Sequence, residues 1–395
     1  MSVADSMVEK AKRAAGSFGL VTPVDEEWEL PGGRARVYYG AGPKGMVRPV
    51  VLADGFGLGP TDFDRLWNGM ETGPFPFVSE LRRRGRTLVL VGFAERGASI
   101  LGNAETMTSA LLRTVSVQPG EAQLLVGGFG VGGLVARYAL ARMETQRVDH
   151  RTGVYLSFDS PHRGAWLPIG LQALAHHLAP YDDTCLRQID SPAARQFLWR
   201  HLDSVEGTPG ESPLRTEFKQ RLRDVGDWPR LPRLLAVSSG RGDGTGNGVR
   251  AGAKALSCAG PLFDGTRFLA QAQGRKTEVA ALNGVLGGPR TITTDGFPEL
   301  DGAPGSTLGS FGLLADALAA AGENTGVTHR RVCFVPSVSA VAIGDLDQQA
   351  DLYADIAELP PEQSEFDDFR LSSDNNAHGL MTEELGFWIL DRLPD

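Results

Sequence analysis

The segment from Val126 to Tyr138 has the residue pattern that most strongly indicates chemistry. It reads Val-Gly-Gly-Phe-Gly-Val-Gly-Gly-Leu-Val-Ala-Arg-Tyr, an aliphatic run followed by clustered glycines and then a helical pattern. Gly128 and Gly132 flank Gly130 at two residues on either side, and small residues there let a strand and a helix pack around a sharp turn. A serine at the centre of such a turn acts as a nucleophile. The centre here is Gly130, so the turn is expected without that hydroxyl.

A serine nucleophile needs a histidine to accept its proton and a carboxylate to orient that histidine. His378 precedes a C-terminal helical pattern, in Asn376-Ala377-His378-Gly379-Leu380, and is the candidate base. Asp243 follows a predicted strand by a few residues and is the candidate acid. An aspartate among glycines is equally typical of an ordinary turn, so Asp345 and Asp374 remain alternatives.

Backbone N–H groups are the expected donors to a developing negative charge. The N–H of Val131 directly follows the turn centre and would lie at a helix N-terminus. The second donor is expected from Phe56 or Gly57, in Asp54-Gly55-Phe56-Gly57 after the first buried strand. Gly57, Phe129 and Trp166 are expected to line the substrate pocket. Because the donors belong to the backbone, a missing serine side chain would leave them in place.

Together these segments resemble the α/β-hydrolase fold, in particular its lipase and esterase branch. There the turn reads Gly-x-Ser-x-Gly-Gly-Leu-Val-Ala-Arg-Tyr, and the tail matches this chain residue for residue from Gly132 to Tyr138. Asp54 stands where the family's His-Gly loop has its histidine, and His162 belongs to a segment similar to the family's Thr-Pro-His-x-Gly, where it is expected to be structural. The loop around His378 is similar to the family's catalytic histidine loop. The resemblance covers residues 48 to 392 apart from two insertions, and it implies a carboxylic ester hydrolase.

The elements that must position these residues also fit this fold. Short aliphatic runs alternate with helical patterns, which is typical of βαβ units around a mostly parallel sheet flanked by helices. Residues 1–395 are expected to form a single domain, in which 165–230 read as a helical cap and 245–305 as a β-rich insertion. The predicted buried strands are 49–53, 87–91, 123–126, 153–158, 233–238 and 331–335, after a leading hairpin over 28–39. The apolar cap segment 166–171 predicts an apolar ester, acyl or polyketide-like substrate.

Composition narrows the classes of function. A net charge of −9 makes the chain a poor candidate for binding nucleic acid or an anionic membrane surface. The three cysteines form no CxxC pair, and the histidines and acids show no ligand spacing such as His-Glu-x-x-His, so no metal or organic cofactor is expected. No run of 18 apolar residues occurs, so no membrane span is expected. Residues 1–13 lack the pattern of a signal peptide, which predicts a cytoplasmic protein of undetermined oligomeric state.

Gly130 leaves three interpretations open. In the first, glycine replaces serine, naturally or by engineering, in an ordinary esterase. In the second, His378 and its acid activate a water or deprotonate a substrate, as in a water-using hydrolase, lyase or cyclase. In the third, the chain is a non-catalytic ligand-binding protein that kept the pocket. A nucleotide-binding domain is a weaker alternative. Its Gly-x-Gly-x-x-Gly pattern is met by Gly128, Gly130 and Gly133, but Glu144 and Asp149 are only loosely placed for the acid such a site needs.

Overall fold

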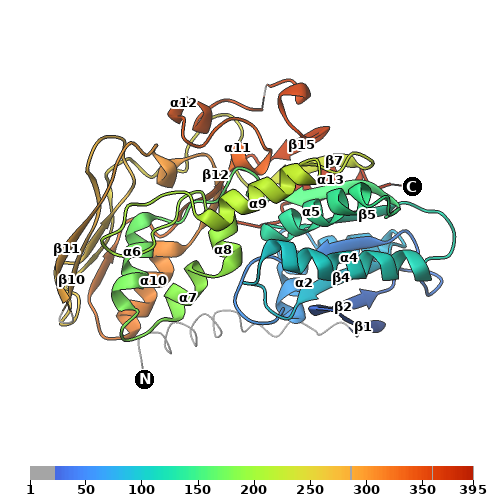
Figure 1. The fold of residues 1–395 in the computed structure, drawn as a ribbon, viewed down its shortest axis with the longest axis horizontal. Helices are drawn as coiled ribbons and strands as arrows, with labels where there is room; N and C mark the ends of the chain where they lie inside the picture. Colours follow the sequence, from blue (N-terminus) through green and yellow to red (C-terminus); the bar gives the residue numbers. More distant parts are fainter. Residues whose placement is uncertain (1–22, 285–286, 358, 395) are drawn as a thin grey trace.

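The computed structural model describes residues 23–284, 287–357 and 359–394 (Figure 1). Its central sheet has eight strands in the order β1-β2-β4-β3-β5-β6-β7-β15. The β1–β2 and β2–β4 pairs are antiparallel and all the others are parallel. The strands are β1 (Glu26–Leu30), β2 (Gly33–Tyr38), β3 (Val50–Ala53), β4 (Leu88–Phe93), β5 (Leu124–Phe129), β6 (Thr152–Phe158), β7 (Arg233–Ser238) and β15 (Asp368–Leu371). The predicted mostly parallel sheet is therefore confirmed.

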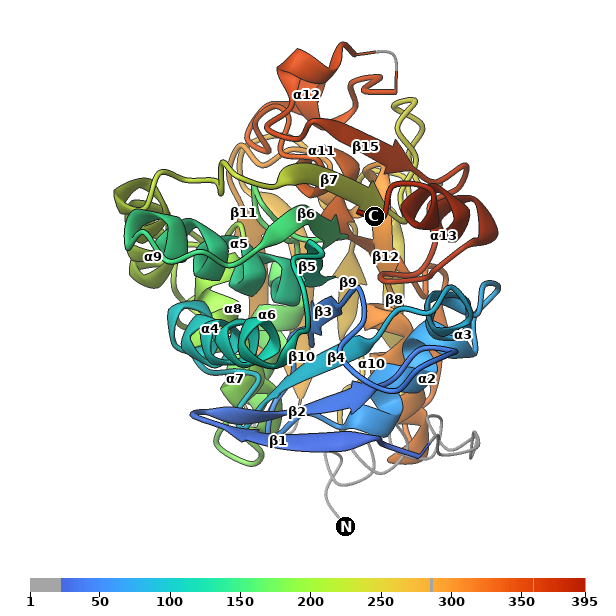
Figure 2. The same cartoon turned by 90° about the vertical axis from the view of Figure 1, so that its right-hand side faces the viewer.

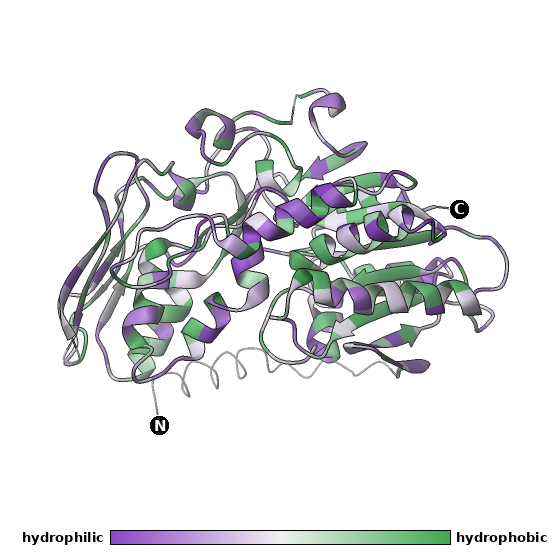
Figure 3. Ribbon diagram, in the orientation of Figure 1, coloured by the Kyte–Doolittle hydropathy of each residue, from purple (hydrophilic) through white to green (hydrophobic). Residues whose placement is uncertain are grey.

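Helices cover both faces of this sheet, so its middle strands are buried throughout. All four residues of β3 are buried, and successive ones pack on opposite faces: Val51 belongs to one core cluster and Val50 to the other. One face carries α4 (Ile100–Val117) and α5 (Val131–Thr145), and the other carries α2 (Phe63–Glu71), α3 (Phe77–Arg83) and α13 (Glu383–Leu390) (Figure 2). Figure 3 shows the inner strands of this sheet as largely hydrophobic.

Two segments interrupt the alternation of strands and helices. Between β6 and β7 lie α6 (Ile169–Leu178), α7 (Thr184–Ile189), α8 (Pro192–Phe197) and α9 (Pro213–Asp224), all within the region read as a cap. Between β7 and β15 lies a second sheet of order β11-β10-β9-β8-β13, against which α6 packs. Its strands are β8 (Lys254–Cys258), β9 (Arg267–Leu269), β10 (Thr277–Gly284), β11 (Gly287–Thr294) and β13 (Thr325–Val327). The β-rich insertion thus continues past residue 305, and one buried cluster runs from the central sheet into it.

The strand predicted over 331–335 forms, but not in the central sheet. It is β14 (Val332–Pro336), which pairs antiparallel with β12 (Gly305–Leu308) in a separate two-stranded sheet. The eighth place in the central sheet is taken by β15, a short strand with the sequence Asp-Phe-Arg-Leu at the sheet edge. Only partial burial is needed at an edge, so β15 lacks the continuous apolar run that marks the inner strands.

The insertion also carries α10 (Ser310–Ala320), α11 (Ser337–Ala340) and α12 (Gln349–Leu352), with short 3₁₀ turns over Leu300–Gly302 and Pro361–Gln363. Across the described ranges, no helix combines the length and the apolar character needed to cross a membrane. The expectation that the chain begins without a signal peptide falls on residues 1–22, which lie outside the described ranges.

Candidate active site

The glycine-rich turn lies between β5 and α5, as the sequence predicts. Gly130 has φ 53° and ψ −120°, a conformation that side chains rarely adopt, and its N–H donates to the carbonyl oxygen of Phe158 at 2.8 Å. The flanking glycines permit close approach: a Cβ on Gly128 would clash with the backbone of Gly132, and one on Gly132 would lie 2.5 Å from the carbonyl oxygen of Ala53. The turn therefore has the strand-turn-helix geometry of a nucleophile elbow, with a glycine at its centre.

His378 faces the tip of this turn. A Cβ built on Gly130 would lie 2.9 Å from the imidazole Nε2. The histidine belongs to the loop between β15 and α13, whose N-terminus is capped by the Thr382 side chain accepting from the N–H of Leu385. The backbone N–H of His378 donates to the carbonyl oxygen of Thr307 at 2.9 Å. The structure thus brings together the turn centre and the histidine that the sequence singled out.

The carboxylate beside His378 is that of Asp159. Its Oδ2 lies 3.6 Å from Nδ1 of the histidine, and its side chain is fully buried. Oδ1 accepts the N–H of Ser239 and Oδ2 accepts the N–H of Gly379, both at 2.8 Å. Asp159 directly follows β6, the neighbour of β5, and the carboxyl ends of adjacent parallel strands share one edge of the sheet. That shared edge is the signal that could have added Asp159 to the candidate acids.

The structure does not bring the candidate acid Asp243 to the histidine. Its exposed carboxylate pairs with the Arg241 guanidinium and accepts the N–H of Thr245 at 3.0 Å. These hydrogen bonds lower the pKa of Asp243 far below its usual value. After β7 the chain continues into the insertion, where the backbone of Asp243 forms an isolated antiparallel β-bridge with that of Asp355. The alternative candidate acids, Asp345 and Asp374, are exposed and accept hydrogen bonds from backbone N–H groups of their own loops.

Two backbone donors lie around the turn. Val131 is the first residue of α5, and Phe56 belongs to the loop after β3. Among the described residues, no acceptor takes the N–H of either one. Asp54 fixes the loop by accepting from the N–H of Gly55 at 2.7 Å and from Thr61 Oγ1 at 2.8 Å, and burial raises its pKa. This loop reaches the elbow, since a Cβ on Gly55 would lie 3.1 Å from the carbonyl oxygen of Phe129.

Burial sets the charge of the candidate base. The His378 side chain is 23% exposed, and the ring of Phe334 packs edge-on against the imidazole with centroids 5.0 Å apart. Burial lowers the pKa of His378 below its usual value of 6.5, and the negative charge of Asp159 partly offsets this. The imidazole is therefore neutral at pH 7 and able to accept a proton.

The residues expected to line a pocket differ in exposure. Phe129 is half-buried and packs on Phe158. Gly57 lies beneath the Arg96 guanidinium, whose Nη2 would be 2.6 Å from a Cβ on that glycine. Trp166 is only 1% exposed, and its indole N–H donates to Oδ1 of the buried Asp301 at 2.8 Å. The structure thus places Trp166 in the core, where it joins the cap to the insertion.

His162 takes part in a buried structural network. Its Nε2 lies 2.8 Å from Ser157 Oγ and its Nδ1 lies 3.3 Å from the guanidinium of Arg137. Burial and the charge of Arg137 lower the pKa of His162 well below its usual value. The ring also packs against Trp228 and Phe366. The side chain of His162 is thus tied to β6 and α5 while remaining partly exposed.

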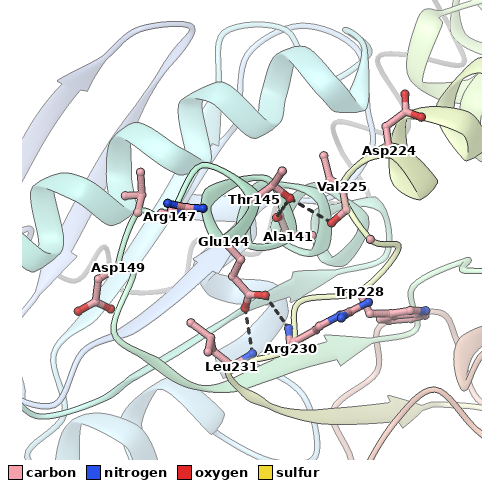
Figure 4. A pocket seen from close by; sticks show the side chains of 12 residues that line it. Ala141, Glu144, Thr145, Arg147, Asp149, Asp224, Val225, Trp228, Arg230 and Leu231 are labelled. Atoms are coloured by element: carbon pink, nitrogen blue, oxygen red, sulfur yellow. Dashed lines mark hydrogen bonds between the residues drawn. The ribbon is translucent and has the colours of Figure 1, made fainter.

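A groove of about 600 Å³ lies at the opposite end of α5 from the elbow (Figure 4). Its walls come from the C-terminal turns of α5 and from residues 224–231. Glu144 closes one side by accepting the N–H groups of Arg230 and Leu231 at 2.7 and 3.0 Å. Since α5 has 15 residues, the groove is about 20 Å from Gly130 and forms no part of the site.

In the described ranges no group of three His, Cys, Asp or Glu side chains is arranged to hold a metal ion.

Comparison with known proteins finds likeness in structure alone. No protein-family model matches the chain, and no curated protein matches it in sequence. A Bacillus licheniformis lipase in its mature form aligns at 12% identity over 53% of this chain and 73% of its own, with a TM-score of 0.34. A Pyrobaculum calidifontis esterase aligns at 14% identity over 60% and 74%, with a TM-score of 0.37. An esterase B from Lactobacillus rhamnosis aligns at 15% identity over 60% and 75%, with a TM-score of 0.35.

The fold is therefore identified from the order and directions of the strands and not from these alignments. An antiparallel β1–β2 pair leads into parallel strands in the order β4-β3-β5-β6-β7-β15, with the strained turn between β5 and α5 and the histidine loop after the last strand. The chain has the α/β-hydrolase fold.

Proposed function

We propose that this protein is an esterase-type hydrolase in which His378 acts on water rather than on a serine hydroxyl. The observation that carries the proposal is that Nε2 of His378 would lie 2.9 Å from a Cβ on Gly130, with the buried Asp159 carboxylate on the other side of the ring. A base aimed at the elbow tip, with its orienting acid behind it, is the arrangement that serves acyl transfer. The side chain of a nucleophile is absent at residue 130.

The reaction would run through one tetrahedral intermediate. A water hydrogen-bonded to Nε2 attacks the carbonyl carbon of the ester, and Nε2 takes its proton. The N–H groups of Val131 and Phe56 donate to the resulting oxyanion. The intermediate collapses by breaking the bond to the leaving alkoxide, which receives the proton from Nε2. No acyl-enzyme forms, because residue 130 has no side chain.

The substrate is assigned as an apolar ester or acyl compound. Three half-buried phenylalanines belong to the segments around the reacting centre: Phe56 in the donor loop, Phe129 before the turn, and Phe334 against His378. Two charged groups at the donor loop, Asp54 and Arg96, lie 3.8 Å from each other and so partly offset each other's charge. An apolar acyl group would therefore be favoured over a charged one.

The pH dependence tests the role of His378. We expect kcat/KM for p-nitrophenyl esters to rise with pH through a midpoint below 6.5 and to level off above it, because burial lowers the pKa of the imidazole and the neutral form is the base. His378→Gln should lose about 10²- to 10⁴-fold in kcat/KM, the usual contribution of a general base. Turnover that keeps its rate and its pH profile in His378→Gln would contradict the proposal.

Intact-mass measurement during turnover separates the two hydrolytic routes. The chain should never carry a covalent acyl group and should not react with a fluorophosphonate probe. His162→Gln is a matched control, since that histidine is hydrogen-bonded to Ser157 and Arg137 rather than facing Gly130; a folded variant should keep its pH profile. If apolar esters bind but neither the chain nor any variant hydrolyses them, the protein is a ligand-binding member of the fold and the proposal fails.

A further inference from the structure

The imidazole Nδ1 of His378 has two neighbours, and the closer one is not the carboxylate. Ser306 Oγ lies 3.1 Å from Nδ1, whereas Asp159 Oδ2 lies 3.6 Å from it. A distance of 3.6 Å exceeds that of a hydrogen bond, so in this geometry the serine hydroxyl is the hydrogen-bond partner of the ring. Asp159 contributes its negative charge from slightly farther away.

The carboxylate is held in place by other groups. Each of its oxygens accepts a backbone N–H at 2.8 Å, from Ser239 and from Gly379. Charge-assisted bonds of this kind are strong and fix the orientation of the carboxylate. The hydroxyl of Ser306 supplies the contact with Nδ1 that the carboxylate does not make.

Ser306 comes from the insertion between β7 and β15. It is fully buried in β12 and pairs with Val335 of β14. The next residue, Thr307, accepts the N–H of His378 at 2.9 Å and donates its own N–H to the carbonyl oxygen of Asn376 at 2.8 Å. Phe334 of β14 packs edge-on against the imidazole. The two-stranded β12–β14 sheet therefore contacts the histidine through its backbone, its Nδ1 and its ring.

We propose that Ser306 is a positioning residue that accepts the Nδ1 proton of His378 and so leaves the lone pair of Nε2 facing Gly130. A neutral imidazole carries one proton, and a base acting through Nε2 must carry it on Nδ1. The hydroxyl oxygen at 3.1 Å can accept that proton, and the Asp159 carboxylate at 3.6 Å, which can only accept, favours the same tautomer over one in which the hydroxyl donates to Nδ1. The catalytic consequence rests on the proposed function, whereas the tautomer is a property of the resting protein.

The tautomer can be measured without turnover. In protein labelled with ¹⁵N-histidine, the side-chain shifts of His378, assigned by their loss in His378→Gln, should report a proton on Nδ1 at pH 7.5. Ser306→Ala should increase the Nε2-protonated fraction, and Ser306→Thr, which keeps the hydroxyl, should restore the original shifts. Ser337→Ala is the matched control, because Ser337 is also buried but its Oγ has no hydrogen-bond partner among the described residues.

Activity provides a second readout. Ser306→Ala should lower kcat about 10-fold with little change in KM, and Ser306→Thr should recover most of it. A proton on Nε2 in the unmodified chain, or identical shifts in Ser306→Ala and the unmodified chain, would overturn the proposal. If Ser306→Ala does not fold, Ser306→Cys, whose thiol is a weaker acceptor, should shift the tautomer in the same direction. Failure of the proposed function alone would show as normal tautomer shifts without any ester turnover.

Discussion

Replacing Gly130 with serine is expected to make the protein react with a fluorophosphonate probe and to raise ester turnover about 100-fold or more. The expectation follows from what the structure already holds: Nε2 of His378 beside the Cβ position, the Asp159 carboxylate behind the ring, and N–H groups of Val131 and Phe56 that no described residue accepts. Loss of the serine from a working triad costs about a million-fold in turnover, while about 10³- to 10⁴-fold over water survives without it. Adding the hydroxyl should recover part of that difference.

The same substitution should cost stability. At φ 53° a Cβ is strained, which costs about 1–3 kcal/mol for a residue other than glycine. The His378 ring must also move, since 2.9 Å from Nε2 to a Cβ is closer than side chains normally approach. Gly130→Ala is the matched control because it carries the same strain without the hydroxyl. Both variants should show a similar fall in Tm, and only the serine variant should be labelled.

The labelling result distinguishes the interpretations of Gly130. Labelling and fast hydrolysis by Gly130→Ser, with no His378-dependent turnover in the unmodified chain, would favour a replaced serine in an ordinary esterase. Labelling together with slow His378-dependent turnover in the unmodified chain would favour native chemistry on water. A serine variant as stable as Gly130→Ala that stays unlabelled would show that the remaining groups are not a hydrolase triad, and would favour a ligand-binding or other non-hydrolytic role.

Local sequence patterns were enough to predict the inner strands of the central sheet and the turn. The elbow depends on glycines within a few residues of one another, and the inner strands are buried on both faces, so each is marked by its own composition. The acid depends instead on which strand ends lie next to the histidine loop. Asp159 and Asp243 both follow parallel strands, and only the three-dimensional path of the chain after β7 separates them. The contact between Ser306 and His378 could not be predicted from local patterns either, because the strand of Ser306 pairs with β14 outside the central sheet.

Asp159→Asn should lower kcat for ester hydrolysis about 100-fold or more, with little change in KM, because the base loses the charge that stabilises its protonated form. It should also shift the low-pH limb of kcat/KM to still lower pH, because the charge of Asp159 raises the pKa of His378 and its removal leaves burial unopposed. A purely structural residue would not move that limb. Stability should fall by about 1–3 kcal/mol, since the amide NH₂ would face either the N–H of Ser239 or that of Gly379.

Asp243→Asn is the matched comparison, because it makes the same chemical change at the acid that the sequence pattern favoured. The Asp243 carboxylate is exposed and pairs with Arg241, so its loss should leave kcat, KM and the pH profile of the unmodified protein unchanged. Urea unfolding and the pH dependence of kcat/KM, measured on both variants, decide between the two carboxylates. A loss of kcat in Asp243→Asn with a normal Asp159→Asn would mean that the chain after β7 reaches the histidine in the working enzyme, and the assignment of Asp159 would have to be withdrawn.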